Sequence, residues 1–176
     1  KFVGLEVINE SALTATPDKD IKFGICITTY KIDGGKRGNH MTTEKVLTDC
    51  LKSIKEQSFP GWKAYIMGDG YPQDEWPEIE KLVYSILPKD KVWMDNMKTP
   101  GERDKYEGSI PHLTGGNTAA NHIIDQMKSD GIKYFSRLDH DDAWKSDHLK
   151  IHAQAYTQYP DVIYTLTQAR KKRVKG

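Results

Sequence analysis

Hydrophobic positions along the chain fall into short apolar runs and longer stretches in which apolar residues recur every three or four positions. The short runs are rich in β-branched and aromatic residues and predict buried strands at 22–29, 62–67, 91–94, 133–138 and 162–166. The longer stretches predict helices at 43–57, at 76–86, between an N-cap at Asn117 and a stop at Gly131, and between an N-cap at Ser146 and Pro160. This alternation is typical of βαβ units. The sequence therefore predicts an α/β fold with an open, mostly parallel sheet flanked by helices.

Three of the predicted strands end in conspicuous polar sequences. They are "TTY" (28–30), "GDG" (68–70) and "RLDHDD" (137–142). The carboxyl ends of parallel strands meet at one edge of a sheet, and open α/β sheets bind their ligands there. We therefore expect these three sequences to form one site.

Three aspartates within four residues repel one another unless a cation or full solvation compensates them. Mg²⁺ and Mn²⁺ prefer oxygen ligands and often take only one or two protein carboxylates, which leaves room for substrate phosphates. The stretch "RLDHDD" by itself fits either a metal site at Asp139 and Asp141 or a solvated acidic turn.

Other polar residues, taken together with the acidic stretch, indicate a nucleoside diphosphate with a metal on its pyrophosphate. Asp69 lies between two glycines, so a ligand can approach the backbone, and its carboxylate could accept N–H groups of a base or hydroxyls of a ribose; the alternative is a tight turn. The stretch 115–117 begins a predicted helix, where free N–H groups favour phosphate. His148 and His152 have i, i+4 spacing, but without a third zinc ligand an ordinary exposed helix face is favoured.

Composition and charge narrow the class of protein. The chain has 176 residues, 37% hydrophobic and 29% charged, which suits one globular domain, and its net charge of +1 indicates neither a nucleic acid nor a membrane partner. No apolar run approaches the roughly 18–20 residues of a membrane span, and no signal peptide is visible. We therefore expect a cytoplasmic protein without a transmembrane segment. Cys26 and Cys50 lie in apolar patterns and are expected to be reduced core residues.

The domain organisation follows from the same patterns. We expect a lead-in segment at 1–21, one α/β domain at 22–169 and a basic tail at 170–176. The chain starts at Lys1 and not at Met, so we expect a processed form or part of a longer protein.

Five stretches together resemble the nucleotide-binding half of the family 2 glycosyltransferases, which have the GT-A fold. The stretches are "ICITTY" (25–30), "VLTDCLKSIKEQSFPGW" (46–62), "YIMGDGYPQDE" (65–75), "GGNTAANHII" (115–124) and "SRLDHDDAWKSDHLKIHAQAYTQYPDVIYT" (136–165). The last is the most specific, and the resemblance covers about 22–166. The chain departs from the family pattern at three positions: Gly68 stands where the family has Asp, Tyr71 where it has Ser, and Ala120 where it has Arg.

The resemblance implies transfer of a sugar from a nucleoside-diphosphate sugar, UDP-linked, to a glycan or other hydroxyl acceptor, with inversion and with Mn²⁺ or Mg²⁺ as cofactor. It implies nucleotide-binding roles for Thr28, Thr29, Tyr30, Asp69, Gly70, Asn117, Asn121, Arg137 and Asp139. It implies metal ligation by Asp139 and Asp141, and contact of Asp69 with the base. The family's catalytic base lies well downstream of the metal motif, so it is expected beyond Gly176, or an unusual residue serves.

Three alternatives stay open at the level of the sequence. A sugar-1-phosphate nucleotidyltransferase shares the half-fold, but "TTYKIDGGKRG" (28–38) is a poor version of its Gly-rich, Arg-containing signature. A phosphatase of the haloacid-dehalogenase class also has an Asp-x-Asp pair after a strand. That pair normally follows the first strand and is followed closely by Thr or Val, whereas Asp142 and Ala143 follow it here. A non-catalytic sugar-nucleotide binding module would fit the missing base.

Overall fold

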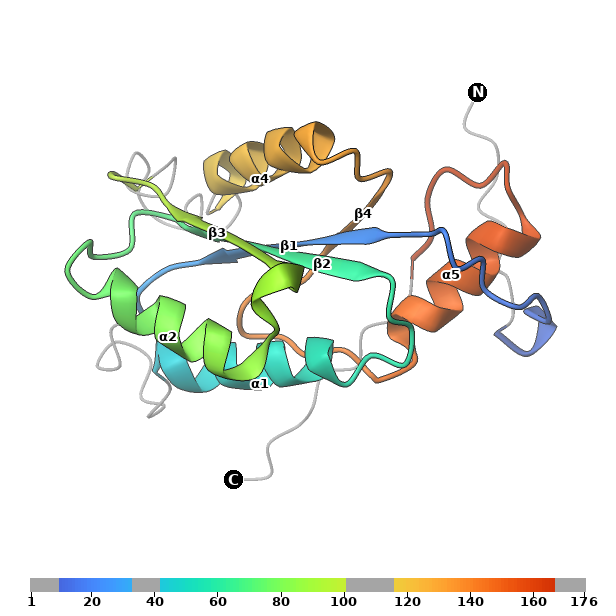
Figure 1. Cartoon of the computed structure of the whole chain (residues 1–176), viewed down its shortest axis with the longest axis horizontal. Coiled ribbons are helices and arrows are strands. Elements are labelled where there is room, and N and C mark those ends of the chain that lie inside the picture. The colour runs from blue at the N-terminus through green and yellow to red at the C-terminus, as the bar shows by residue number, and fades with distance from the viewer. Residues whose placement is uncertain (1–9, 33–41, 101–115, 167–176) are drawn as a thin grey trace, which may run out of the picture.

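The computed structural model describes residues 10–32, 42–100 and 116–166, which form a parallel sheet covered by helices on both faces (Figure 1). In this described part the sheet has four strands in the order β3-β2-β1-β4, and every neighbouring pair is parallel. The strands are β1 (Phe23–Thr29), β2 (Trp62–Gly68), β3 (Val92–Asn96) and β4 (Tyr134–Arg137). The predicted α/β class and parallel sheet are confirmed.

The helices make two layers around this sheet. In Figure 1, α4 lies above the sheet, and α1 and α2 lie below it. The helices are α1 (Thr43–Lys55), α2 (Trp76–Ile86), α4 (Asn117–Ser129) and α5 (His148–Gln158). Two short 3₁₀ turns, η1 (Glu10–Ala12) and η2 (Lys89–Lys91), complete the described elements.

The core is divided by the sheet because successive side chains of a strand point to opposite faces. Ile25 and Ile27 of β1 join the cluster that contains Leu47 and Leu51 of α1, whereas Cys26 joins the cluster under α4. Cys26 and Cys50 are both fully buried free thiols, as expected. Burial raises the pKa of each to about 12, so both stay protonated and unreactive.

The helix boundaries confirm some sequence signals and correct others. Gly131 ends α4 as predicted: it has a φ of 70°, and its N–H and that of Ile132 close a Schellman motif on Lys128 O and Met127 O. The predicted N-cap Asn117 is wrong, because Gly116, with a φ of 77°, occupies that position and Asn117 is the first helical residue. Ser146 is not the cap of the next helix either, since α5 begins at His148 directly after Asp147.

The predicted strand at 162–166 is also wrong. This segment leaves α5 as irregular chain and pairs with no strand in the described part of the molecule. Ile163, Tyr164 and Leu166 are 96%, 56% and 72% exposed. A β-branched run favours a strand only where a neighbouring strand offers hydrogen-bonding groups, and none of the described strands lies beside this segment.

Residues 10–21 of the predicted lead-in segment are hydrogen-bonded to α5. The Gln158 side chain accepts from Thr14 N and Ala15 N and donates to Ala12 O, and Gln154 donates to Ala15 O. The predicted basic tail at 170–176 and most of the Gly-rich loop after β1 lie outside the described residues.

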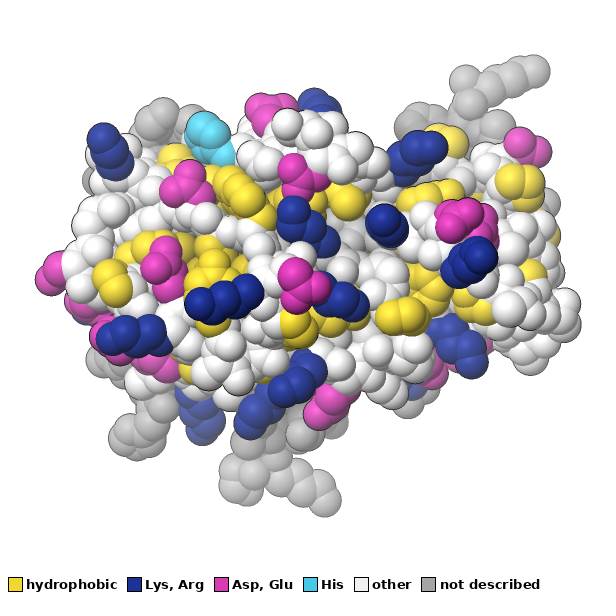
Figure 2. Space-filling view, viewed as in Figure 1, with side chains coloured by type: hydrophobic (Ala, Val, Ile, Leu, Met, Phe, Trp, Pro, Cys, Tyr) yellow, Lys and Arg dark blue, Asp and Glu magenta, His cyan; other side chains and the backbone are white. Residues whose placement is uncertain are grey.

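The surface matches the small net charge. Figure 2 shows Lys and Arg side chains interspersed with Asp and Glu over the face drawn. Among the helices of the described residues, none combines the length and the apolar character that crossing a membrane requires.

Candidate functional site

The carboxyl ends of β1 and β2 bring "TTY" and "GDG" side by side. Thr29 lies opposite Gly68 in the parallel register, and Asp69 N donates to Thr29 O at 2.7 Å. Thr29 is fully buried and Asp69 is 2% exposed. The aspartate is therefore fixed at the sheet edge beside the end of the central strand.

Asp69 also connects the sheet to the N-terminus of α4. Its Oδ2 accepts a hydrogen bond from Gly116 N at 3.2 Å. A Cβ at Gly116 would lie 2.6 Å from Thr28 Oγ1, so the backbone of Gly116 approaches Thr28 as closely as only glycine permits. The buried carboxylate thus lies at the positive end of α4, where a negative charge is stabilised. Gly70, the next residue, has a φ of 68° and completes the tight turn that the sequence offered as an alternative.

The acidic turn after β4 has a buried centre and exposed flanks. His140 is 2% exposed; its Nδ1 is hydrogen-bonded to Thr29 Oγ1 at 2.9 Å, and its ring packs on Tyr30 with centroids 4.7 Å apart. The turn is closed by Asp142 N, which donates to Asp139 O at 3.0 Å. Asp139 and Asp141, on either side of His140, are exposed.

The charges of this turn act on one another. Arg137 Nε donates to Asp139 Oδ1 at 3.3 Å, but both side chains are about half exposed, so this pair adds little stability. Burial, and then the charges of Asp141 and Asp139, raise the pKa of Asp142 above its ordinary value. The turn is therefore a site of negative potential that favours a cation.

The residues of the turn suit one class of metal. No group of three or more His, Cys, Asp or Glu side chains that could hold a metal ion occurs within 10–32, 42–100 and 116–166, so a closed structural zinc site is not formed there. Asp139 and Asp141 offer two hard carboxylates directed to solvent. This donor set suits Mg²⁺ or Mn²⁺, which complete their coordination with water and phosphate oxygens.

The loop after the acidic turn is hydrogen-bonded to Ser53 of α1 and to Gln57 just beyond the end of this helix, two residues for which no role was predicted. Ser53 Oγ accepts from Trp144 N at 3.2 Å. Gln57 donates to Lys145 O at 2.7 Å and accepts from Leu149 N at 2.9 Å. Both belong to the stretch "VLTDCLKSIKEQSFPGW" (46–62), which carried part of the family resemblance. That motif was the available signal, but its partners lie far away in the sequence.

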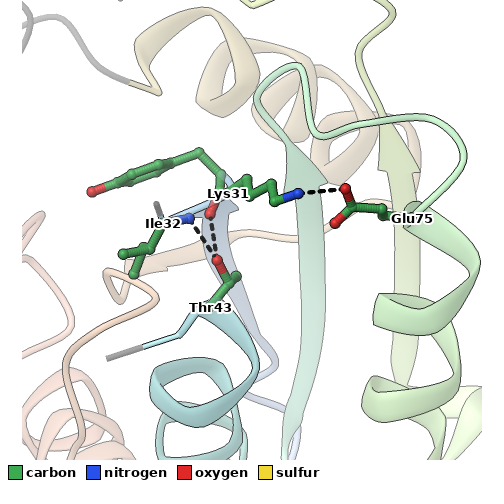
Figure 3. Close-up of polar contacts among 5 residues, drawn as sticks. Lys31, Ile32, Thr43 and Glu75 are labelled. Carbon is green, nitrogen blue, oxygen red and sulfur yellow. Dashed lines mark hydrogen bonds and ion pairs between the residues drawn. The ribbon is translucent and has the colours of Figure 1, made fainter. Parts of the chain in front are cut away.

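A second set of contacts fixes the chain that follows β1. Thr43, 2% exposed at the start of α1, donates to Tyr30 O at 3.1 Å and accepts from Ile32 N at 2.8 Å. Figure 3 shows this hydroxyl with its two hydrogen bonds to the backbone that follows β1, together with the ion pair of Lys31 and Glu75. These contacts hold the backbone of Tyr30 beside the acidic turn.

The structure explains why position 68 carries glycine. A Cβ at Gly68 would lie 2.2 Å from Asn96 Oδ1, because Asn96 of β3 fills that space. Its amide accepts from Tyr71 N at 3.1 Å and donates to Tyr71 O at 2.9 Å. A larger residue at position 68 would therefore displace Asn96, which holds the turn after β2.

Asn117 and Asn121 lie one turn apart at the beginning of α4, and both are exposed. His148 and His152 do not form the ordinary exposed helix face that the sequence favoured. The ring of His148 stacks on Trp144 at 4.2 Å, and His152 is 8% exposed and hydrogen-bonded to Thr165. Burial lowers the pKa of both, that of His148 to about 4.

Comparison with known proteins gives the family. No protein-family model matches the chain. Over 150 residues, 85% of this chain, it is 33% identical to an uncharacterized glycosyltransferase of Acanthamoeba polyphaga mimivirus. Its fold matches the crystal structure of residues 1–349 of TarS from S. aureus with a TM-score of 0.54 and 18% identity, over 80% of this chain and 33% of that one. The chain is a GT-A-type glycosyltransferase domain.

This glycosyltransferase domain also has a more distant relative in hyaluronan synthase 2 of Bos taurus, with 28% identity over 97 residues, 51% of this chain and 16% of that protein. The chain spans 57% of the length of the mimivirus relative. The domain therefore corresponds to part of these longer proteins.

Proposed function

We propose that this domain binds a nucleoside-diphosphate sugar, with UDP as the nucleotide, and transfers the sugar to a hydroxyl of a glycan or other acceptor with inversion. The observation that carries the proposal is the convergence of three strand ends and one helix N-terminus. Asp69 contacts Gly116, and His140 contacts Thr29, so "TTY", "GDG", the start of α4 and the acidic turn form one edge.

In this proposal the nucleotide lies along the ends of β1 and β2. Thr28, Thr29 and Tyr30 line its pocket, and Asp69 with Gly70 faces the base, since a fixed buried carboxylate is suited to accept N–H donors. Asn117 and Asn121 on α4 would contact the sugar or phosphates. The structural neighbour TarS has also been crystallised in complex with UDP, which supports this choice of nucleotide.

The diphosphate would lie at the acidic turn. Arg137, about 42% exposed, can donate to its oxygens, and Asp139 and Asp141 would hold Mn²⁺ or Mg²⁺. When bound, such a metal acts as a Lewis acid that takes up charge on the leaving diphosphate. The contacts of His140, Ser53 and Gln57 keep the turn and its following loop in place for this role.

The metal-dependent part of the proposal is tested by thermal shift. We expect the largest gain in melting temperature of the wild type when UDP and Mn²⁺ are added together, because ligands that bind the folded state stabilise it, by about 2.7 kcal/mol at a hundredfold excess over Kd. Asp141→Asn should lose this shift while its ligand-free form is as stable as the wild type or slightly more so, since one like charge is removed.

The matched control is Asp125→Asn on α4, where the carboxylate is 77% exposed and paired with Lys128. It should respond to the ligands as the wild type does. No shift in the wild type would refute the proposed function, and a full shift in Asp141→Asn would refute the metal assignment alone.

Transfer itself is tested with labelled UDP-sugars and hydroxyl acceptors. Release of UDP with a glycosylated product of inverted configuration is the expected result. Donor binding without any turnover would instead indicate a sugar-nucleotide binding module, and exchange of pyrophosphate into the donor would indicate a nucleotidyltransferase.

A further inference from the structure

His140 lies between the two carboxylates proposed to hold the metal, yet its own side chain is directed into the protein. It is 2% exposed, whereas the side chain of Asp139 is 57% exposed. Burying an imidazole is costly unless its polar atoms are hydrogen-bonded. The burial of His140 therefore requires partners inside the protein, whereas the exposed carboxylates beside it are solvated by water.

The partners of His140 come from the end of the central strand. Its Nδ1 is hydrogen-bonded to Thr29 Oγ1 at 2.9 Å, across 111 positions of sequence. Its ring packs on Tyr30 with an interplanar angle of 30°. Tyr30 is in turn held through its carbonyl by Thr43. A single side chain thus ties the acidic turn to the segment proposed to line the nucleotide pocket.

We propose that His140 is a positioning residue that makes nucleotide binding and metal binding cooperative. The inference rests on the proposed function. With the imidazole held by Thr29 and Tyr30, the turn has one orientation relative to the end of β1. Asp139 and Asp141 then face the place where a diphosphate attached to a nucleotide on β1 would lie. Without this contact the acidic turn and the end of β1 would still be present, but they would no longer have a fixed orientation relative to each other.

The coupling between UDP binding and Mn²⁺ binding distinguishes a positioning role of His140 from a loss of stability alone. Coupling between two ligands is reciprocal, so Mn²⁺ tightens UDP binding by the same factor by which UDP tightens Mn²⁺ binding. Replacing a residue that orients metal ligands commonly costs 10–100-fold in metal affinity. We expect His140→Phe, which keeps a ring for Tyr30 and removes the hydrogen bond, to reduce this coupling factor about tenfold or more. UDP affinity without metal should change little.

Three further variants separate the contacts. Thr29→Val removes the same hydrogen bond from the other side with a similar shape, so it should reduce the coupling factor as His140→Phe does. His140→Asn can still place a polar atom near Thr29 and should retain part of the coupling. His122→Phe replaces an exposed histidine of α4 and should behave as the wild type.

The experiment is isothermal titration calorimetry of UDP with and without Mn²⁺, and of Mn²⁺ with and without UDP, on the folded variants. An unchanged coupling factor in His140→Phe would overturn the inference. If His140→Phe does not fold, an unchanged coupling factor in both Thr29→Val and His140→Asn would overturn it. So would an equal loss of UDP affinity with and without metal. If the wild type itself shows no Mn²⁺-dependent UDP binding, the proposed function fails, and the inference fails with it.

Discussion

Gln57 connects α1 to the loop that follows the acidic turn, and its replacement tests how that loop is held. The residue is 8% exposed and uses both ends of its amide. It donates to Ser53 O and Lys145 O at 2.9 and 2.7 Å and accepts from Leu149 N at 2.9 Å. Gln57→Leu keeps an apolar stem of similar length and removes all three hydrogen bonds.

The size of the effect follows from the groups left behind. Leu149 is fully buried at the beginning of α5, and Lys145 O is partly buried, so neither group regains a full set of water contacts. Leaving a buried donor or acceptor unsatisfied costs about 1–3 kcal/mol. We therefore expect Gln57→Leu to lower the free energy of unfolding by about 2–4 kcal/mol, which is roughly 5–15 °C in melting temperature for a chain of this size.

The measurement is urea unfolding followed by far-UV circular dichroism, with the slope of the transition compared between variants. Gln126→Leu is the matched control, because its amide makes an exposed hydrogen bond to Asp130 on α4. Its stability should stay within about 0.5 kcal/mol of the wild type. If Gln57→Leu also stays within that range at an unchanged slope, the three hydrogen bonds do not hold the loop and the reasoning is wrong.

Two further predictions concern Asp69 and His148. Asp69→Asn should lower the free energy of unfolding by about 1–2 kcal/mol, since Gly116 N loses a charged acceptor at the start of α4; equal urea midpoints would contradict this. Burial lowers the pKa of His148 from 6.5 to about 4, so the unfolded state binds the proton first. Stability present above pH 6.5 should be lost as the pH falls towards 4, by about 1–2 kcal/mol after allowance for its partial exposure, and His148→Gln should flatten this slope.

The order of strands and helices could be predicted from the sequence because it depends on local periodicity. The run Phe23–Thr29 and the stripe of α1 each bury their apolar residues within a few positions of one another, and such patterns are visible in a short window. The position of the candidate site followed as well. Once the strands are parallel, their carboxyl ends must share one edge, so "TTY", "GDG" and "RLDHDD" had to converge.

The same local signals failed where the outcome depends on distant neighbours. The run 162–166 has a strand pattern, but a strand needs a partner, and none lies beside it in the described part of the fold. His148 has the sequence context of an exposed helix face, yet Trp144 stacks on it. Asn117 has the propensity of a cap, but the chain approaches Thr28 so closely at the preceding residue that Gly116 takes that position.

The roles of His140 and Gln57 were decided by the tertiary structure alone. Their partners Thr29 and Leu149 lie 111 and 92 positions away. A sequence shows that a histidine stands between two aspartates and that a glutamine follows a helix, but not which way either side chain points. That direction depends on which strands become neighbours and where α1 packs, because a buried polar group must find its hydrogen-bond partner among whatever the fold brings beside it.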